Sequence, residues 1–88
     1  MEEIKKLRER INKIDQAIIQ KLATREKIVR KIGLFKAAKK KDIQDVAREK
    51  KLLHFYNKLC KQYQLDQVYV NQIFKLIISH SKKLQKNV

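Results

Sequence analysis

Apolar residues recur at alternating steps of three and four from Ile4 to Ile18, which is the spacing of one face of an α-helix, and further apolar residues continue this stripe to Phe35. The stripe consists of Ile4, Leu7, Ile11, Ile14, Ile18, Leu22, Ile28, Val29, Ile32 and Phe35. Proline is absent from the chain, and Gly33, its single glycine, is tolerated inside a helix. We therefore predict one unbroken helix that ends before the lysines at 39–41.

This predicted helix is too long for its own chain to cover. Some 35 residues make a rod about 50 Å long, whereas a compact domain of this size has a radius of gyration of roughly 12 Å. The apolar stripe therefore needs a second chain, and we predict a homodimer.

Two shorter helices are expected to follow. One begins near Asp42 to Asp45, either of which suits an N-cap, and runs to about Tyr63. Its inner residues are Val46, Leu52, Leu53, Tyr56 and Leu59. The other begins at Asp66, and its inner residues are Val70, Ile73, Phe74, Ile77 and Ile78. The predicted fold class is all-α: one long and two shorter helices per chain, in an intertwined homodimeric bundle.

Basic residues far outnumber acidic ones. The chain has 23 Lys and Arg against 9 Asp and Glu, a formal net charge of +14. These cations are spread along the whole chain, and most suit solvated helix faces. The charge indicates an anionic partner but does not by itself distinguish a metabolite from a nucleic acid.

The N-terminal residues are charged and lack the apolar core of a signal peptide. No apolar run approaches the roughly 20 residues of a membrane span. The single Cys60 has no partner for an intrachain disulfide and is expected to pack as a small hydrophobe. We expect a cytoplasmic protein that does not associate with membranes.

Cations stand where the stripe of the first helix should remain apolar. The series of positions 4, 11 and 18 leads to Arg25, and the series 22 and 29 leads to Lys36. The 11 residues between them correspond to about 20° around a helix, so both lie on one face. For either cation alone, a side chain that reaches solvent is the simpler interpretation.

The shorter helices show the same interruption. Asp45, Arg48 and Glu49 lie at i, i+3 and i+4, where an intrahelical ion pair is the simpler interpretation. Ser81 and Gln85 continue the last apolar stripe, where a frayed helix end is the simpler interpretation. Together these residues predict a buried pocket with more cations than carboxylates. Because buried cations need anionic partners, its ligand should be a small dianion.

The polar positions occur in order in five segments: LRERINKIDQAII, LATREKIV, IGLFKA, DIQDVAREKKLL and LDQVYVNQIFKLIISHSKKLQ. The motif residues are Arg8 with Asp15, Arg25, Gly33 with Lys36, Asp45 with Arg48 and Glu49, and Ser81 with Gln85. In these residues the chain resembles the all-α, bacterial-type chorismate mutase family, and residues 1–88 are expected to form one such domain. The resemblance implies an isomerase that rearranges chorismate to prephenate within one molecule, for phenylalanine and tyrosine biosynthesis, without cofactor or metal.

The resemblance also implies roles for these residues. Arg8 and Arg25 would clamp the two substrate carboxylates, with guanidinium forks suited to that geometry. Lys36 would contact a carboxylate and the ether oxygen, to which Gln85 would be the second donor. Glu49 and the backbone near Asp45 would receive the ring hydroxyl. Ser81 would contact a carboxylate, and Arg48 would give electrostatic or structural support.

Arg8 cannot serve the pocket of its own chain. It lies 17 residues from Arg25, roughly 25 Å along a helix and about 100° around it. In the family the partner protomer contributes the first arginine, and this spacing agrees with that arrangement.

Other interpretations compete with the mutase. An isochorismate pyruvate lyase has the same fold, but such lyases typically lack the Asp-x-x-Arg-Glu run found at Asp45–Glu49. A basic nucleic-acid binder or a plain coiled coil would explain the charge or the stripe, but neither explains Glu49 and Gln85, so we expect no nucleic-acid partner. The length indicates a monofunctional enzyme. Lys39–Lys41, Lys82 and Lys83 are expected to steer the dianion.

Overall fold

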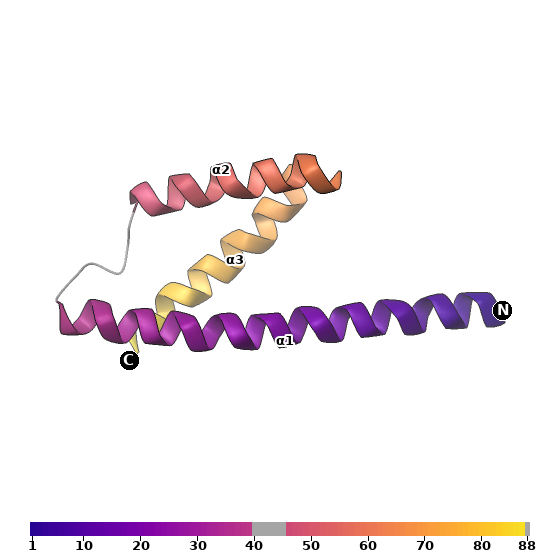
Figure 1. Ribbon diagram of the computed structural model, residues 1–88, viewed down its shortest axis with the longest axis horizontal. Helices are drawn as coiled ribbons and strands as arrows, with labels where there is room; N and C mark the ends of the chain where they lie inside the picture. Colours follow the sequence, from indigo (N-terminus) through magenta and orange to yellow (C-terminus); the bar gives the residue numbers. More distant parts are fainter. Residues whose placement is uncertain (40–45, 88) are drawn as a thin grey trace.

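The computed structural model describes residues 1–39 and 46–87, which form three α-helices and no strand (Figure 1). They are α1 (Glu2–Ala38), α2 (Val46–Tyr63) and α3 (Gln67–Lys86). The predicted all-α class, with one long and two shorter helices, is confirmed. The proposed N-cap of α2 at 42–45 lies outside the described residues.

α1 is one continuous helix of 37 residues, as the stripe and the absence of proline predicted. α3 crosses diagonally between α1 and α2 and packs against both (Figure 1). The N-terminal part of α1, drawn in indigo, projects beyond the turn that joins α2 to α3. The chain is therefore open: its radius of gyration is 16.5 Å, against roughly 12 Å for a compact domain of this length.

The turn between α2 and α3 is closed by two caps. Gln64 has a φ of 57°, and the Leu65 N–H donates to the Cys60 carbonyl at 2.9 Å, which is a Schellman cap at the end of α2. The Asp66 carboxylate then accepts from the N–H groups of Val68 and Tyr69 at 2.8 and 3.2 Å. The predicted N-cap at Asp66 is confirmed.

The core of the single chain is small. Its buried apolar residues are Val29, Tyr56 and Cys60, and the Tyr56 ring stacks on Phe74 with centroids 4.1 Å apart. The expectation that Cys60 packs as a small hydrophobe is confirmed, since it is 2% exposed. Val46 and Leu53 were predicted to face inward, yet both are about half exposed because α3 covers only one side of α2.

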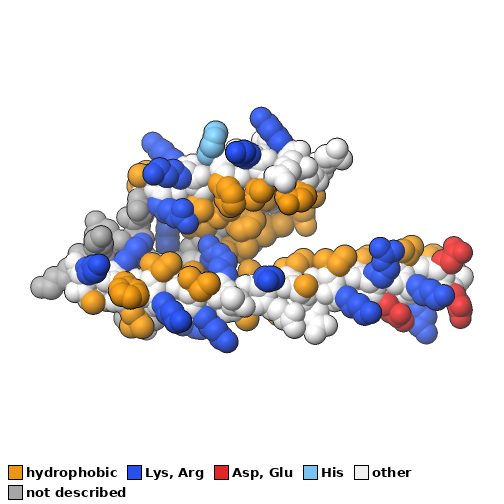
Figure 2. Space-filling view, viewed as in Figure 1, with side chains coloured by type: hydrophobic (Ala, Val, Ile, Leu, Met, Phe, Trp, Pro, Cys, Tyr) orange, Lys and Arg blue, Asp and Glu red, His pale blue; other side chains and the backbone are white. Residues whose placement is uncertain are grey.

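Most of the apolar stripe of α1 is uncovered. Ile4, Leu7, Ile11, Ile14 and Ile18 are all 46–60% exposed. Figure 2 shows hydrophobic side chains along the projecting part of α1 and on the side of α2 and α3 that is turned toward α1. In the described parts of the chain, no helix has both the length and the apolarity needed to cross a membrane.

Candidate active site

A cavity of about 280 Å³ lies where the C-terminal half of α1, the start of α2 and the end of α3 come together. It is lined by Arg25, Val29, Ile32, Lys36, Arg48, Glu49, Leu52, Ile78, Ser81, Lys82 and Gln85. Six residues that the sequence assigned to the site are therefore brought together in one chain. They are Arg25, Lys36, Arg48, Glu49, Ser81 and Gln85. Asp45 lies outside the described residues.

α1 supplies two cations to this cavity. Arg25 and Lys36 are half-buried and both line it, so the prediction that they share a face is confirmed. About three helical turns separate them, and Val29 and Ile32 fill the wall between. The apolar spacers keep the cations apart, which leaves room for one anionic group beside each.

The Arg25 guanidinium is held by α3. Its Nη1 donates to Ser81 Oγ at 2.5 Å, and Ser81 Oγ donates in turn to the Ile77 carbonyl at 2.8 Å. Ser81 is buried and α3 continues to Lys86, so the frayed-end interpretation is wrong for this residue. Because the Ser81 hydroxyl is fixed by both hydrogen bonds, it orients the Arg25 guanidinium at the cavity.

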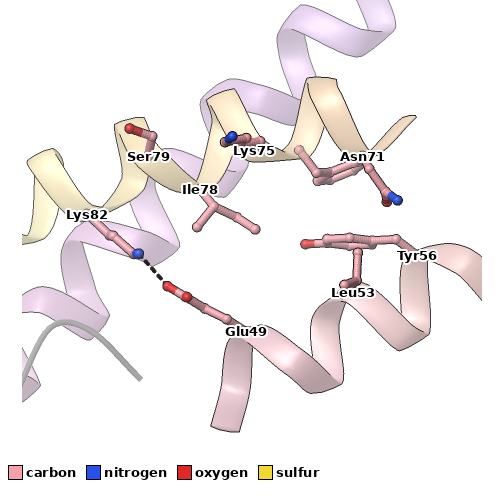
Figure 3. Close-up of a pocket in the computed structure, with 9 residues that line it drawn as sticks. Glu49, Leu53, Tyr56, Asn71, Lys75, Ile78, Ser79 and Lys82 are labelled. Atoms are coloured by element: carbon pink, nitrogen blue, oxygen red, sulfur yellow. Dashed lines mark ion pairs between the residues drawn. The ribbon is translucent and has the colours of Figure 1, made fainter. Parts of the chain in front are cut away.

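Glu49 lies in the first turn of α2 and pairs with Lys82 of α3, across the cavity wall (Figure 3). Glu49 Oε1, the oxygen that contacts the Lys82 ammonium, is shielded from solvent. The ion pair thus joins two helices. Arg48, the neighbouring residue, lines the same cavity with a more exposed side chain.

Lys82 was expected only to steer a ligand from the surface, but it lines the cavity itself. The signal was present in the sequence: Lys82 follows Ile78 by four residues and therefore lies beside the last apolar stripe. Its role in the cavity was not predicted because Ser81, the residue directly before it, was already assigned to the cavity, and adjacent residues of a helix usually face different directions.

Arg8 does not reach this cavity in its own chain. It lines a separate hollow at the other end of α1, with Ile4, Lys5 and Asn12 among its neighbours. Because α1 is unbroken between Arg8 and Arg25, the two residues are about 25 Å apart along the helix axis.

The described lining residues carry four cations, Arg25, Lys36, Arg48 and Lys82, against one carboxylate, Glu49. This excess suits a small ligand with two negative charges. Within residues 1–39 and 46–87, no three His, Cys, Asp or Glu side chains gather into a group that could hold a metal ion.

A larger cavity of about 520 Å³ adjoins the first one between α2 and α3 (Figure 3). Leu53, Tyr56 and Phe74 give it an apolar floor, and it shares Glu49, Ile78 and Lys82 with the smaller cavity. We assign the candidate active site to the smaller cavity because the charged groups from all three helices converge there.

The cation-rich pocket between three helices suits a small polyanion, and comparison with known proteins specifies the family of the chain. The chain matches chorismate mutase type II over residues 7–86. It is 31% identical over 86 residues to a chorismate mutase of Methanocaldococcus jannaschii, a match that covers 98% of this chain and 87% of that protein. This chain belongs to the chorismate mutase type II family.

Bifunctional relatives match as well. The chain is 41% identical over 81 residues to a bifunctional chorismate mutase/prephenate dehydratase of Buchnera aphidicola subsp. Acyrthosiphon pisum, and 32% identical over 80 residues to that of Escherichia coli K12. These matches cover 92% and 91% of this chain but 21% of each relative. The chain therefore spans about a fifth of the length of these relatives.

Proposed function

We propose that this protein is a chorismate mutase that rearranges chorismate to prephenate in phenylalanine and tyrosine biosynthesis. The observation that carries the proposal is the convergence of Arg25, Lys36, Glu49 and Gln85 from three helices on one cavity. The family and the named relatives support it. A cytoplasmic location and a single mutase domain over 1–88 are parts of the same proposal.

The reaction is a [3,3] rearrangement, in which an ether C–O bond breaks while a C–C bond forms within the same molecule. It needs no nucleophile or general base, so the protein acts by holding a reactive conformer and by stabilising charge on the ether oxygen. Lys36 and Gln85 donate to that oxygen. Arg25 clamps one carboxylate, and an arginine of the second subunit clamps the other.

Glu49 accepts a hydrogen bond from the ring hydroxyl, together with the backbone near Asp45. Arg48 adds positive potential at the rim. The role of Ser81 is refined by its contacts: its hydroxyl proton already points to the Ile77 carbonyl, so Ser81 serves chiefly to orient Arg25 toward a carboxylate.

We further propose that the active form is a homodimer in which Arg8 of the partner subunit completes each pocket. Two observations support this: the exposed stripe of α1 and the separation of Arg8 from Arg25 along one helix. If two antiparallel α1 helices place Arg8 of one chain beside Arg25 of the other, the two-fold axis passes near residues 16 and 17. Apolar stripe residues flank that point on both sides.

The test is the loss of chorismate absorbance in the ultraviolet, with Lys36→Ala and Gln85→Ala as variants. We expect the wild type to turn over chorismate and each variant to lose roughly 10²–10³-fold in kcat/KM, as for removal of one oxyanion donor. Lys27→Ala is the matched control because it removes the same charge from an exposed position of α1 outside the cavity.

The same enzyme is assayed with isochorismate for pyruvate release, which tests the lyase alternative. Turnover of isochorismate in preference to chorismate would replace the mutase assignment with the lyase. A wild type that is inactive on chorismate, or a Lys36→Ala variant as active as Lys27→Ala, would refute the proposal.

A further inference from the structure

The ion pair between Lys82 and Glu49 points to a site residue that the sequence motifs do not assign. We infer that Lys82 is a positioning residue, which holds the Glu49 carboxylate where it can accept a hydrogen bond from the ring hydroxyl of the substrate. The inference rests on the proposed function and deepens it, because it concerns how the pocket recognises a hydroxylated ring.

The contact places Lys82 where it can orient Glu49. The Lys82 ammonium meets Glu49 Oε1 across the gap between α3 and α2, and each side chain is about one-third exposed. Both residues line both cavities, and Figure 3 shows the pair joining α2 and α3 at the larger one. A cation on a different helix thus restrains the carboxylate.

The two oxygens of Glu49 are divided between two tasks. Oε1 is shielded from solvent and lies against Lys82, which supplies the partner that a shielded carboxylate oxygen requires. A carboxylate accepts hydrogen bonds at both oxygens, so we assign the acceptance of the ring hydroxyl to Oε2.

The positive charge of Lys82 also supports its role beside Glu49. A carboxylate beside the binding site of a dianion repels that dianion unless a cation offsets it. Lys82 offsets this negative charge by direct contact with the Glu49 carboxylate. A surface lysine farther along α3 is more distant, and its charge is screened by solvent and salt. Glu49 can then act as a hydrogen-bond acceptor with little penalty to the binding of the substrate carboxylates.

The test compares two substrates on Lys82→Met: chorismate, and the chorismate analogue in which hydrogen replaces the ring hydroxyl. With chorismate we expect kcat/KM to fall about tenfold, the size of one lost charge-assisted hydrogen bond, mostly through KM. With the analogue we expect a clearly smaller fall, because Glu49 has no hydroxyl to bind and only the offset of its negative charge is lost. Lys82→Arg should restore most of the activity on chorismate, since it keeps the cation.

Lys86→Met is the matched control, because it removes the same charge from an exposed position one turn along α3. Equal losses on both substrates, or a Lys82→Met effect no larger than that of Lys86→Met, would overturn the inference, since structural support or steering alone predicts these results. If Lys82→Met does not fold by circular dichroism, Lys82→Gln carries the same comparison.

The outcomes separate this inference from the proposed function. A wild type without activity on chorismate refutes the proposed function, and the inference with it. A wild type that is active and sensitive to Lys36→Ala, but whose Lys82→Met variant shows no hydroxyl-dependent loss, refutes the inference alone.

Discussion

Ser81 stands in an apolar stripe and is buried, yet its hydroxyl is satisfied on both sides. It accepts from Arg25 and donates to the Ile77 carbonyl one turn earlier on its own helix. A buried serine with this arrangement costs little in stability and transmits the rigidity of α3 to the arginine. In the proposed function, this contact fixes the Arg25 guanidinium before it binds a substrate carboxylate.

Replacing Ser81 by Ala should therefore weaken substrate binding more than it weakens the fold. We expect KM for chorismate to rise about tenfold, with a smaller change in kcat, and the free energy of unfolding to fall by about 1 kcal/mol. Steady-state kinetics and urea denaturation measure the two effects. Ser79→Ala, at an exposed position two residues earlier, is the control; an unchanged KM in Ser81→Ala would contradict the role assigned to the hydroxyl.

At the scale of elements, the turn from α2 to α3 sets the angle at which α3 crosses to α1. It depends on a left-handed residue, Gln64, followed by the Asp66 N-cap. A residue with a Cβ is strained in this conformation by about 1–2 kcal/mol, and glycine is not. In this turn Gln64 therefore lowers the stability of the fold, whereas Asp66 raises it.

The two positions should respond in opposite directions. Gln64→Gly is expected to raise the free energy of unfolding by about 0.5–1 kcal/mol, because it relieves strain at the cost of some chain entropy. Asp66→Ala should lower it by about 1 kcal/mol through loss of the cap. Urea denaturation of each variant measures these changes, and Asp66→Asn, which can still cap, serves as the control. A Gln64→Gly variant less stable than wild type would show that the strain is absent in solution.

At the scale of the whole molecule, the long α1 separates two parts of the proposed site. Its C-terminal half supplies Arg25 and Lys36 to one cavity, whereas Arg8 lies near the opposite end. An apolar stripe that is about half exposed connects the two regions. In the proposed dimer, one interface would bury both stripes and complete both pockets.

This arrangement predicts complementation between two inactive chains. In a dimer of Arg8→Ala with Lys36→Ala, one pocket contains both defects and the other contains neither. After full subunit exchange half of the dimers are mixed, so we expect about a quarter of wild-type activity from the equimolar mixture. Chorismate turnover measures this, with subunit exchange confirmed by mass spectrometry of tagged chains. Activity no higher than that of either parent after exchange would show that the site is not shared.

The helices and much of the site could be predicted from the sequence. Spacing of three and four predicted α1, Asp66 predicted the start of α3, and cations in an apolar stripe predicted that Arg25 and Lys36 face one cavity. These predictions succeed because the geometry of a single helix determines which residues share a face. No contact with another helix is needed to derive them.

By itself, then, the sequence determined the three helices, the faces they present and most of the cavity lining. Only the tertiary structure decided that Lys82 pairs with Glu49, that Ser81 holds Arg25, and that α3 leaves Leu53 half exposed. These contacts depend on the angle and position at which α3 crosses its neighbours. Residues far apart in the chain set that crossing jointly, so no local spacing encodes it.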